Sequence, residues 1–113
     1  MKPWFFESNI EQQVREEMQN RGLKLGIDFV IQYPIKFSFI IDIAFPDQKL
    51  AIELDGDYWH STKKNRQRDK MKDSILKREG WSIIRILGSD IETDVSKCVD
   101  YMLYELQKKQ KMT

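Results

Sequence analysis

Three carboxylates lie in two neighbouring apolar segments of this 113-residue sequence. Asp42 stands in the middle of residues 38–45, where a carboxylate is costly to bury unless it is paired or binds a metal. Glu53 and Asp55 are two residues apart, so an alternating strand puts both on one face. If the two segments form paired strands, the three carboxylates converge and offer the oxygen ligands that Mg²⁺ prefers. The alternative for Asp42 is the solvent-facing side of its strand.

The only histidine of the chain, His60, follows these carboxylates after a short turn. Imidazole titrates near neutral pH and suits proton transfer, although a lone histidine is more often structural. Tyr58 and Trp59 precede it directly, which is unusual for a solvated turn. Trp59 is suited both to stacking on DNA bases and to packing beneath the turn, and the sequence leaves both roles open.

The acidic segment at residues 42–57 is followed by a basic segment at residues 63–78. Residues 63–78 hold eight Lys and Arg against two Asp, whereas residues 42–57 hold five Asp and Glu against one Lys. The whole chain has a net charge of only +1. This segregation suits a protein that holds a cation and binds a polyanion, although many solvated helices carry similar runs. The residues expected to grip DNA phosphates are Lys63, Lys64, Arg66, Arg68, Lys70 and Lys72.

Length and composition indicate one domain over residues 1–113, with a polar tail at about 108–113. No segment approaches the roughly 18 consecutive apolar residues of a membrane span, so no membrane partner is expected. Cys98 is the only cysteine, which excludes an internal disulfide and zinc sites built on paired cysteines. We expect it to pack in the core, in a reducing, cytoplasmic setting.

Hydrophobic periodicity predicts the elements that position these residues. Ser8 and Glu11 have the spacing of a capping box, which opens a helix that ends near Gly22. Alternation and turn residues predict strands at about 29–33, 37–45, 50–55 and 81–87. A long helix from about residue 62 to Gly80 is expected to bury Met71, Ile75 and Leu76, and a closing helix runs from about 91 to 106.

The connections between these elements predict their arrangement. Short turns join the first three strands, which should therefore be antiparallel, whereas a helix joins the third strand to the fourth. A crossover through a helix makes those two strands parallel. The fold class is α/β (α+β), a mixed four-stranded sheet with helices on both faces.

The motifs occur in a characteristic order: residues 41–43, residues 50–56, Trp59-His60, Asp69, and Gly80-Trp81 followed by Arg85. This ordered set resembles the very-short-patch-repair-like (Vsr-like) endonucleases of the restriction-endonuclease-like PD-(D/E)xK superfamily. It looks most like the phage homing endonucleases described by an E-D-x-H-D set of catalytic residues. The resemblance implies an αβββαβ core, here followed by a C-terminal helix.

The resemblance also assigns roles. Glu11, Asp42, His60 and Asp69 would be the catalytic E, D, H and D, and Mg²⁺ or Mn²⁺ would be bound by Asp42 and the backbone carbonyl of Leu54. Glu53 and Asp55 are further candidate ligands, although Asp55 stands where the superfamily has the lysine of E-x-K. From the residues alone, Glu11 is equally a capping-box partner and Asp69 an ordinary surface residue.

The function expected is metal-dependent cleavage of double-stranded DNA by the catalytic domain of a homing endonuclease, phage-encoded and acting in a bacterial host. The alternatives are a Vsr-like nicking enzyme in repair or defence, and a non-catalytic nucleic-acid-binding module. The predicted elements leave no helix-turn-helix or other base-reading unit. We therefore expect specificity to come from a further DNA-binding domain outside these residues, from a homodimer, or from both.

Overall fold

The computed structural model describes residues 8–56 and 63–112 of the chain. Within these residues no helix is long and apolar enough to span a membrane. The elements follow in the order α1 (Asn9–Asn20), β1 (Val30–Pro34), the 3₁₀ helix η1 (Lys36–Ser38), β2 (Ile40–Phe45), β3 (Leu50–Asp55), α2 (Lys63–Arg78), β4 (Ser82–Leu87), α3 (Gly88–Thr93) and α4 (Val95–Lys111).

The strands form one mixed sheet in the order β1-β2-β3-β4. The β1–β2 and β2–β3 pairs are antiparallel, and the β3–β4 pair is parallel. This arrangement confirms the predicted fold, because short turns join the first three strands and α2 crosses over between β3 and β4.

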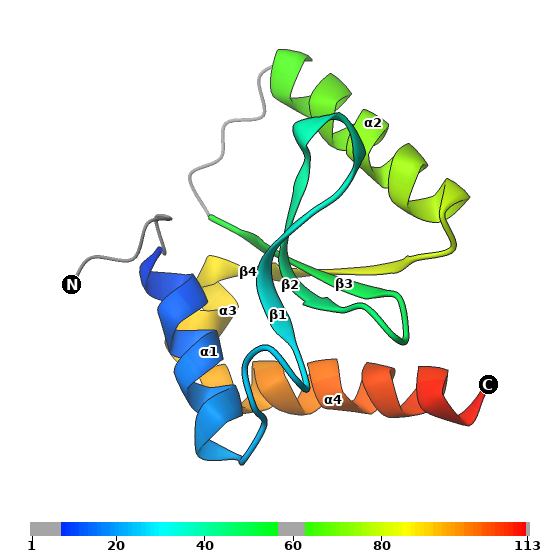
Figure 1. Ribbon diagram of the computed structural model, residues 1–113. Helices are drawn as coiled ribbons and strands as arrows, with labels where there is room; N and C mark the ends of the chain where they lie inside the picture. The colour runs from blue at the N-terminus through cyan, green and yellow to red at the C-terminus, as the bar shows by residue number, and fades with distance from the viewer. Residues whose placement is uncertain (1–7, 57–62, 113) are drawn as a thin grey trace.

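Helices cover both faces of the sheet (Figure 1), with α1, α3 and α4 on one face and α2 on the other. The larger core cluster lies under the first group and the smaller one under α2. The larger cluster includes Val14, Phe29, Phe45, Ile52, Ile91 and Met102, with Cys98 packed against its edge. The smaller consists of Ile41, Ala44, Ala51 and Leu76, with Tyr33 and Trp81 at its margin.

The first helix begins and ends as its sequence predicts. Ser8 caps α1, and its side chain accepts a hydrogen bond from the Glu11 backbone N–H. Val14 and Met18 are buried on the side that faces the sheet. Gly22 follows the helix with φ +92°, a left-handed conformation that glycine adopts without steric cost.

The structure corrects two predicted strand features. The second strand was expected from residue 37, but β2 begins at Ile40, because η1 turns the chain over Lys36–Ser38. The third strand was expected to have one apolar face and one largely acidic face that carries Glu53 and Asp55. Both faces of β3 are buried, since α2 covers the side that carries Glu53.

Two predicted helices also differ from the expectation. Met71 on α2 is 57% exposed, so Ile75 and Leu76 make the buried side of this helix without it. The closing helix is divided into α3 and α4 at Asp94, whose side chain caps α4 by accepting from the Lys97 N–H. The expected polar tail continues α4 as far as Lys111.

β1 and β2 change faces at the same level. Ile31 and Ile43 pair with each other and pack in the larger cluster. Two residues further along each strand, Tyr33 and Ile41 also pair but lie in the smaller cluster. Residues two apart in a regular strand share one face. The backbone between these pairs is therefore irregular, and Asp42 lies there.

Candidate active site

Asp42 lies where β2 and β3 separate. The ladder between the two strands ends at the pair Ile43 and Ile52. Beyond it, the backbone N–H of Leu54 donates a 2.8 Å hydrogen bond to Asp42 Oδ2. The half-buried Asp42 side chain thus satisfies a backbone donor of β3 that the ladder does not use, and this contact orients its carboxylate.

Glu53 is the only buried polar residue among those that the structure describes, with 5% of its surface exposed. Continuing the β2–β3 register by one residue sets it opposite Asp42, on the side of the sheet that α2 covers. Burial and the negative charge of Asp42 raise the pKa of the Glu53 carboxyl from 4.5 to about 8, against the opposing effect of Lys72. The two carboxylates therefore form an electrostatically coupled pair.

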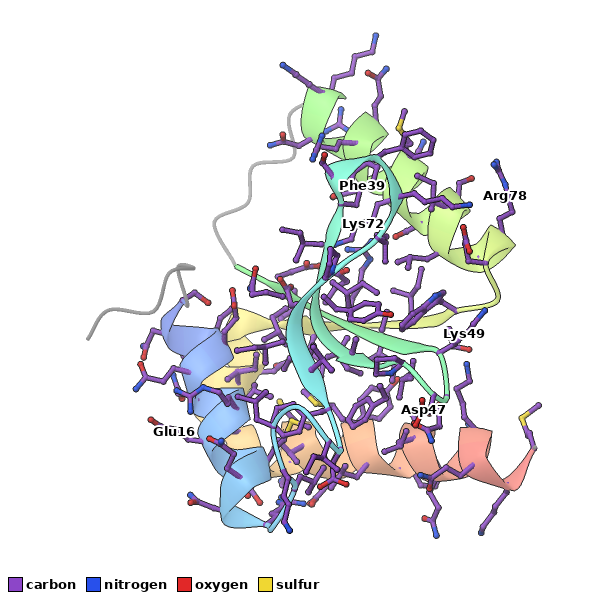
Figure 2. All side chains as sticks on the ribbon, viewed as in Figure 1. Glu16, Phe39, Asp47, Lys49, Lys72 and Arg78 are labelled. Atoms are coloured by element: carbon purple, nitrogen blue, oxygen red, sulfur yellow. The ribbon has the colours of Figure 1, made fainter. Side chains whose placement is uncertain are left out.

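Lys72 brings a positive charge to this pair. Its Nζ lies 2.5 Å from Glu53 Oε1 and donates a hydrogen bond to the Ile40 carbonyl. This contact is an ion pair at hydrogen-bonding distance, and the positive charge of Lys72 opposes the rise in the Glu53 pKa. Lys72 and Phe39 lie where the connection between β1 and β2 meets α2 (Figure 2). The Lys72 side chain is 14% exposed, so the structure places it beside the carboxylates rather than on the open face of α2.

Asp55 has a different neighbour. Its Oδ1 lies 3.7 Å from Arg85 on β4, and Arg85 also donates to Asp73 on α2. Burial raises the pKa of the Asp55 carboxyl, Arg85 opposes this effect, and the negative charges of Asp69 and Asp42 add to it. The structure thus places Asp55 and Asp69 within electrostatic range of each other at the same end of the sheet.

The described residues contain no group of three or more His, Cys, Asp or Glu side chains that could hold a metal ion. Asp42 and Glu53 come together, while Asp55 pairs with Arg85. A coupled pair of carboxylates still fits Mg²⁺, because this ion keeps several waters and uses only one or two carboxylates of the protein. The carboxylate oxygens of Asp42 and Glu53 are hard donors of the kind that Mg²⁺ prefers, although Lys72 contacts Glu53 Oε1 in this structure.

Glu11 is held at the start of α1 from two sides. Ser8 Oγ donates to its Oε1 at 3.1 Å, and Gln32 Nε2 on β1 donates to its Oε2 at 2.7 Å. The Ser8 side chain caps the helix as the sequence predicts, and the Glu11 side chain bonds to the Ser8 hydroxyl. The second contact, which joins α1 to the sheet, was not predicted from the sequence.

The remaining candidate residues fall into two groups. His60 and Trp59 lie outside the described residues. The other expected DNA-binding side chains are exposed on α2, and Arg68 lies 4.6 Å above the ring of Phe39. These exposed basic residues are Lys63, Lys64, Arg66, Arg68 and Lys70.

Comparison with known proteins assigns the family. The family model REase_MTES_1575, a restriction-endonuclease-like domain, matches residues 10–106. The chain belongs to this family. A solved structure, the catalytic domain of the homing endonuclease I-Bth0305I, has the same fold as this REase_MTES_1575 domain. The TM-score is 0.63 at 22% identity, over 94% of this chain and 97% of that one.

Two curated relatives of the REase_MTES_1575 domain match over only part of their own length. An uncharacterised protein of Mycobacterium tuberculosis is 33% identical over 92 residues, which are 78% of this chain and 33% of that protein. The chain thus spans about a third of this relative. The type II nicking enzyme V.NmeDIP of Neisseria meningitidis is 24% identical over 89 residues, 61% of this chain and 60% of that enzyme.

Proposed function

We propose that this REase_MTES_1575 domain is a metal-dependent endonuclease that hydrolyses phosphodiester bonds in double-stranded DNA, as the catalytic domain of a homing endonuclease. The observation that carries the proposal is the carboxylate pair of the half-buried Asp42 and the buried Glu53, at the point where β2 and β3 separate. A protein keeps such a pair at a cost in stability, and shifted pKa values of this kind cluster at functional sites.

Each candidate residue has a proposed role in phosphodiester hydrolysis. Asp42 and Glu53, with the carbonyl of Leu54, are the oxygen donors proposed to hold Mg²⁺ or Mn²⁺, and Asp55, which contacts Arg85, is a further candidate. When bound, the ion supplies stabilisation of the negative charge that develops on the phosphate. His60 is proposed to accept the proton of the attacking water, and Glu11 and Asp69 to orient the reacting groups.

DNA is the polyanion that the exposed side of α2 suits. Lys63, Lys64 and Lys70 carry positive charge on this helix, and contacts of this kind bind phosphates without reading base sequence. Trp59 is proposed to stack on bases beside them. We propose that target selection comes from a second copy of the chain, from a DNA-binding domain outside residues 1–113, or from both.

A single-strand nick is the second candidate outcome. The Neisseria relative is named as a nicking enzyme, and its match covers 61% of this chain. One carboxylate pair per chain cuts one strand at a time, so the number of copies on the DNA decides between a nick and a double-strand break.

The deciding experiment incubates the chain with supercoiled plasmid in Mg²⁺, in Mn²⁺ and in EDTA. We expect open-circular or linear product with the metals and none in EDTA. Asp42→Asn is the matched control, because its amide oxygen can still accept from the Leu54 N–H while the charge is removed. Full cleavage in EDTA, or by this variant, would contradict the proposed site.

A further inference from the structure

Gln32 has an unusual backbone for a residue inside a strand. It lies in β1 with φ +51°, in the left-handed region. Left-handed conformations are disfavoured for a residue with a side chain relative to the ordinary regions, and glutamine has no local device that offsets this. Strain of this kind is retained where surrounding structure enforces it, and it clusters at functional sites.

The position of Gln32 relates this strain to the candidate site. The pairs Ile31–Ile43 and Tyr33–Ile41 flank it, so the register sets Gln32 beside Asp42. These two pairs lie on opposite faces of the sheet. The left-handed residue thus accounts for the change of face in β1 and turns the Gln32 side chain toward α1.

The Gln32 side chain, which points toward α1, makes a hydrogen bond to Glu11. Gln32 Nε2 donates to Glu11 Oε2 at 2.7 Å across 21 positions of sequence, and both groups are partly buried. Ser8 holds the other carboxylate oxygen. An amide that donates to a carboxylate fixes its orientation without adding charge. One residue of β1 therefore touches Glu11 with its side chain and adjoins Asp42 with its backbone.

We infer that Gln32 is a positioning residue of the nuclease site, which holds the Glu11 carboxylate at a fixed place relative to Asp42. This inference rests on the proposed function. The strained backbone keeps the amide pointing at α1, and a regular strand at this position would point it away from Glu11.

Two substitutions of Gln32 test whether it positions Glu11 for catalysis or only stabilises the fold. Gln32→Gly removes the amide and its hydrogen bond to Glu11 but also relieves the left-handed strain, and because these two effects oppose each other its midpoint of urea unfolding should stay close to that of the wild type. Gln32→Glu keeps the size of the side chain but replaces the donor by a second carboxylate. We expect both variants to lose about ten- to a hundredfold in single-turnover cleavage rate, with unchanged DNA affinity, because small displacements of catalytic groups cost rates of this order.

Lys49→Gly is the matched control, since Lys49 also has a left-handed backbone (φ +52°) but lies in the turn between β2 and β3. Figure 2 shows it at the far end of the strands from Lys72. This variant should relieve strain and keep the wild-type rate. A Gln32→Gly or Gln32→Glu protein that cleaves as fast as the wild type would overturn the inference while leaving the proposed function intact. A wild type without metal-dependent cleavage would overturn both.

A double-variant cycle tests whether Gln32 acts through Glu11. Glu11→Asp withdraws the carboxylate from the Gln32 amide, so adding Gln32→Gly in this background should change the rate by less than about threefold, far from additive behaviour. If the cleavage rate of the double variant falls by the product of the two single-variant losses, Gln32 acts on something other than Glu11. This result would overturn the positioning role.

Discussion

The backbone N–H of Leu54 is bound to Asp42 Oδ2 at 2.8 Å, one residue beyond Glu53. One carboxylate oxygen thus joins two strands where their ladder has ended. A main-chain donor holds Asp42, so its orientation does not depend on the long, flexible side chains around it.

This hydrogen bond predicts different outcomes for two substitutions at Asp42. Asp42→Ala leaves the Leu54 N–H without its acceptor and should lower the free energy of unfolding by about 1–3 kcal/mol. Asp42→Asn keeps an acceptor and removes the charge beside Glu53, so it should be close to neutral for stability. Both should lose at least about 10²-fold in cleavage rate.

Urea unfolding and plasmid cleavage measured on the same two proteins check this prediction. Equal stability of the Ala and Asn variants would show that the hydrogen bond from Leu54 contributes little. Cleavage at the wild-type rate by either variant would remove Asp42 from the site.

The raised pKa of Glu53 predicts how stability depends on pH. The folded protein holds a proton on this carboxyl up to about pH 8, whereas the unfolded chain releases it near pH 4.5. Because the folded state binds more protons in this window, the free energy of unfolding should fall as pH rises from about 4.5 to about 8 and then level off.

Glu53→Gln supplies the test, because it cannot ionise. Unfolding of both proteins in EDTA at several pH values between about 5 and 9 should show a smaller fall with pH in the variant. A wild-type stability that rises through this window would contradict the assignment.

The ion pair between Lys72 and Glu53 makes Lys72 a buried partner of the site. Lys72→Met leaves Asp42 and, where it is ionised, Glu53 without a cation, and breaking a buried pair with ionised Glu53 costs on the order of 3 kcal/mol. The loss should be larger at pH 9, where Glu53 is ionised, than at pH 6. Lys70→Met, on the exposed side of the same helix, should change stability by less than about 0.5 kcal/mol. Equal effects of the two substitutions would contradict the buried role of Lys72.

The exposed lysines of α2 should dominate DNA affinity. Replacing Lys63, Lys64 and Lys70 together by Ala should weaken binding to all sequences alike. The slope of log K against log salt should decrease by up to about 0.9 for each phosphate that is no longer neutralised. Lys97→Ala with Lys111→Ala, on α4 across the sheet, is the control and should leave the slope unchanged. Fluorescence anisotropy with target-free duplexes at two or more salt concentrations measures both.

The strands and the meeting of Asp42 with Glu53 follow from alternation and short turns, which are local properties of the sequence. The place of Lys72 was not predicted, because a run of basic residues indicates a solvated helix face. Its spacing of three and four residues from Ile75 and Leu76 was the available indication that it shares their buried side. Gln32 carried no comparable pattern. Its conformation is imposed by the packing of β1 against β2 and α1, and glutamine has no preference for the left-handed region.

The order of the strands in the sheet is the same as their order in the chain. Asp42 and Glu53 are eleven positions apart, and the chain between them is a hairpin with its turn at residues 46–49. A loop of this length closes on the order of 10–100 ns, and its entropic cost is small compared with that of longer loops. The two acids can therefore meet within a nascent hairpin, whereas Lys72 and Glu11 must arrive from helices that dock later. Folding would thus bring two acidic groups together before α2 supplies the positive charge of Lys72, which makes the docking of α2 the step at which the metal-free site gains its charge balance.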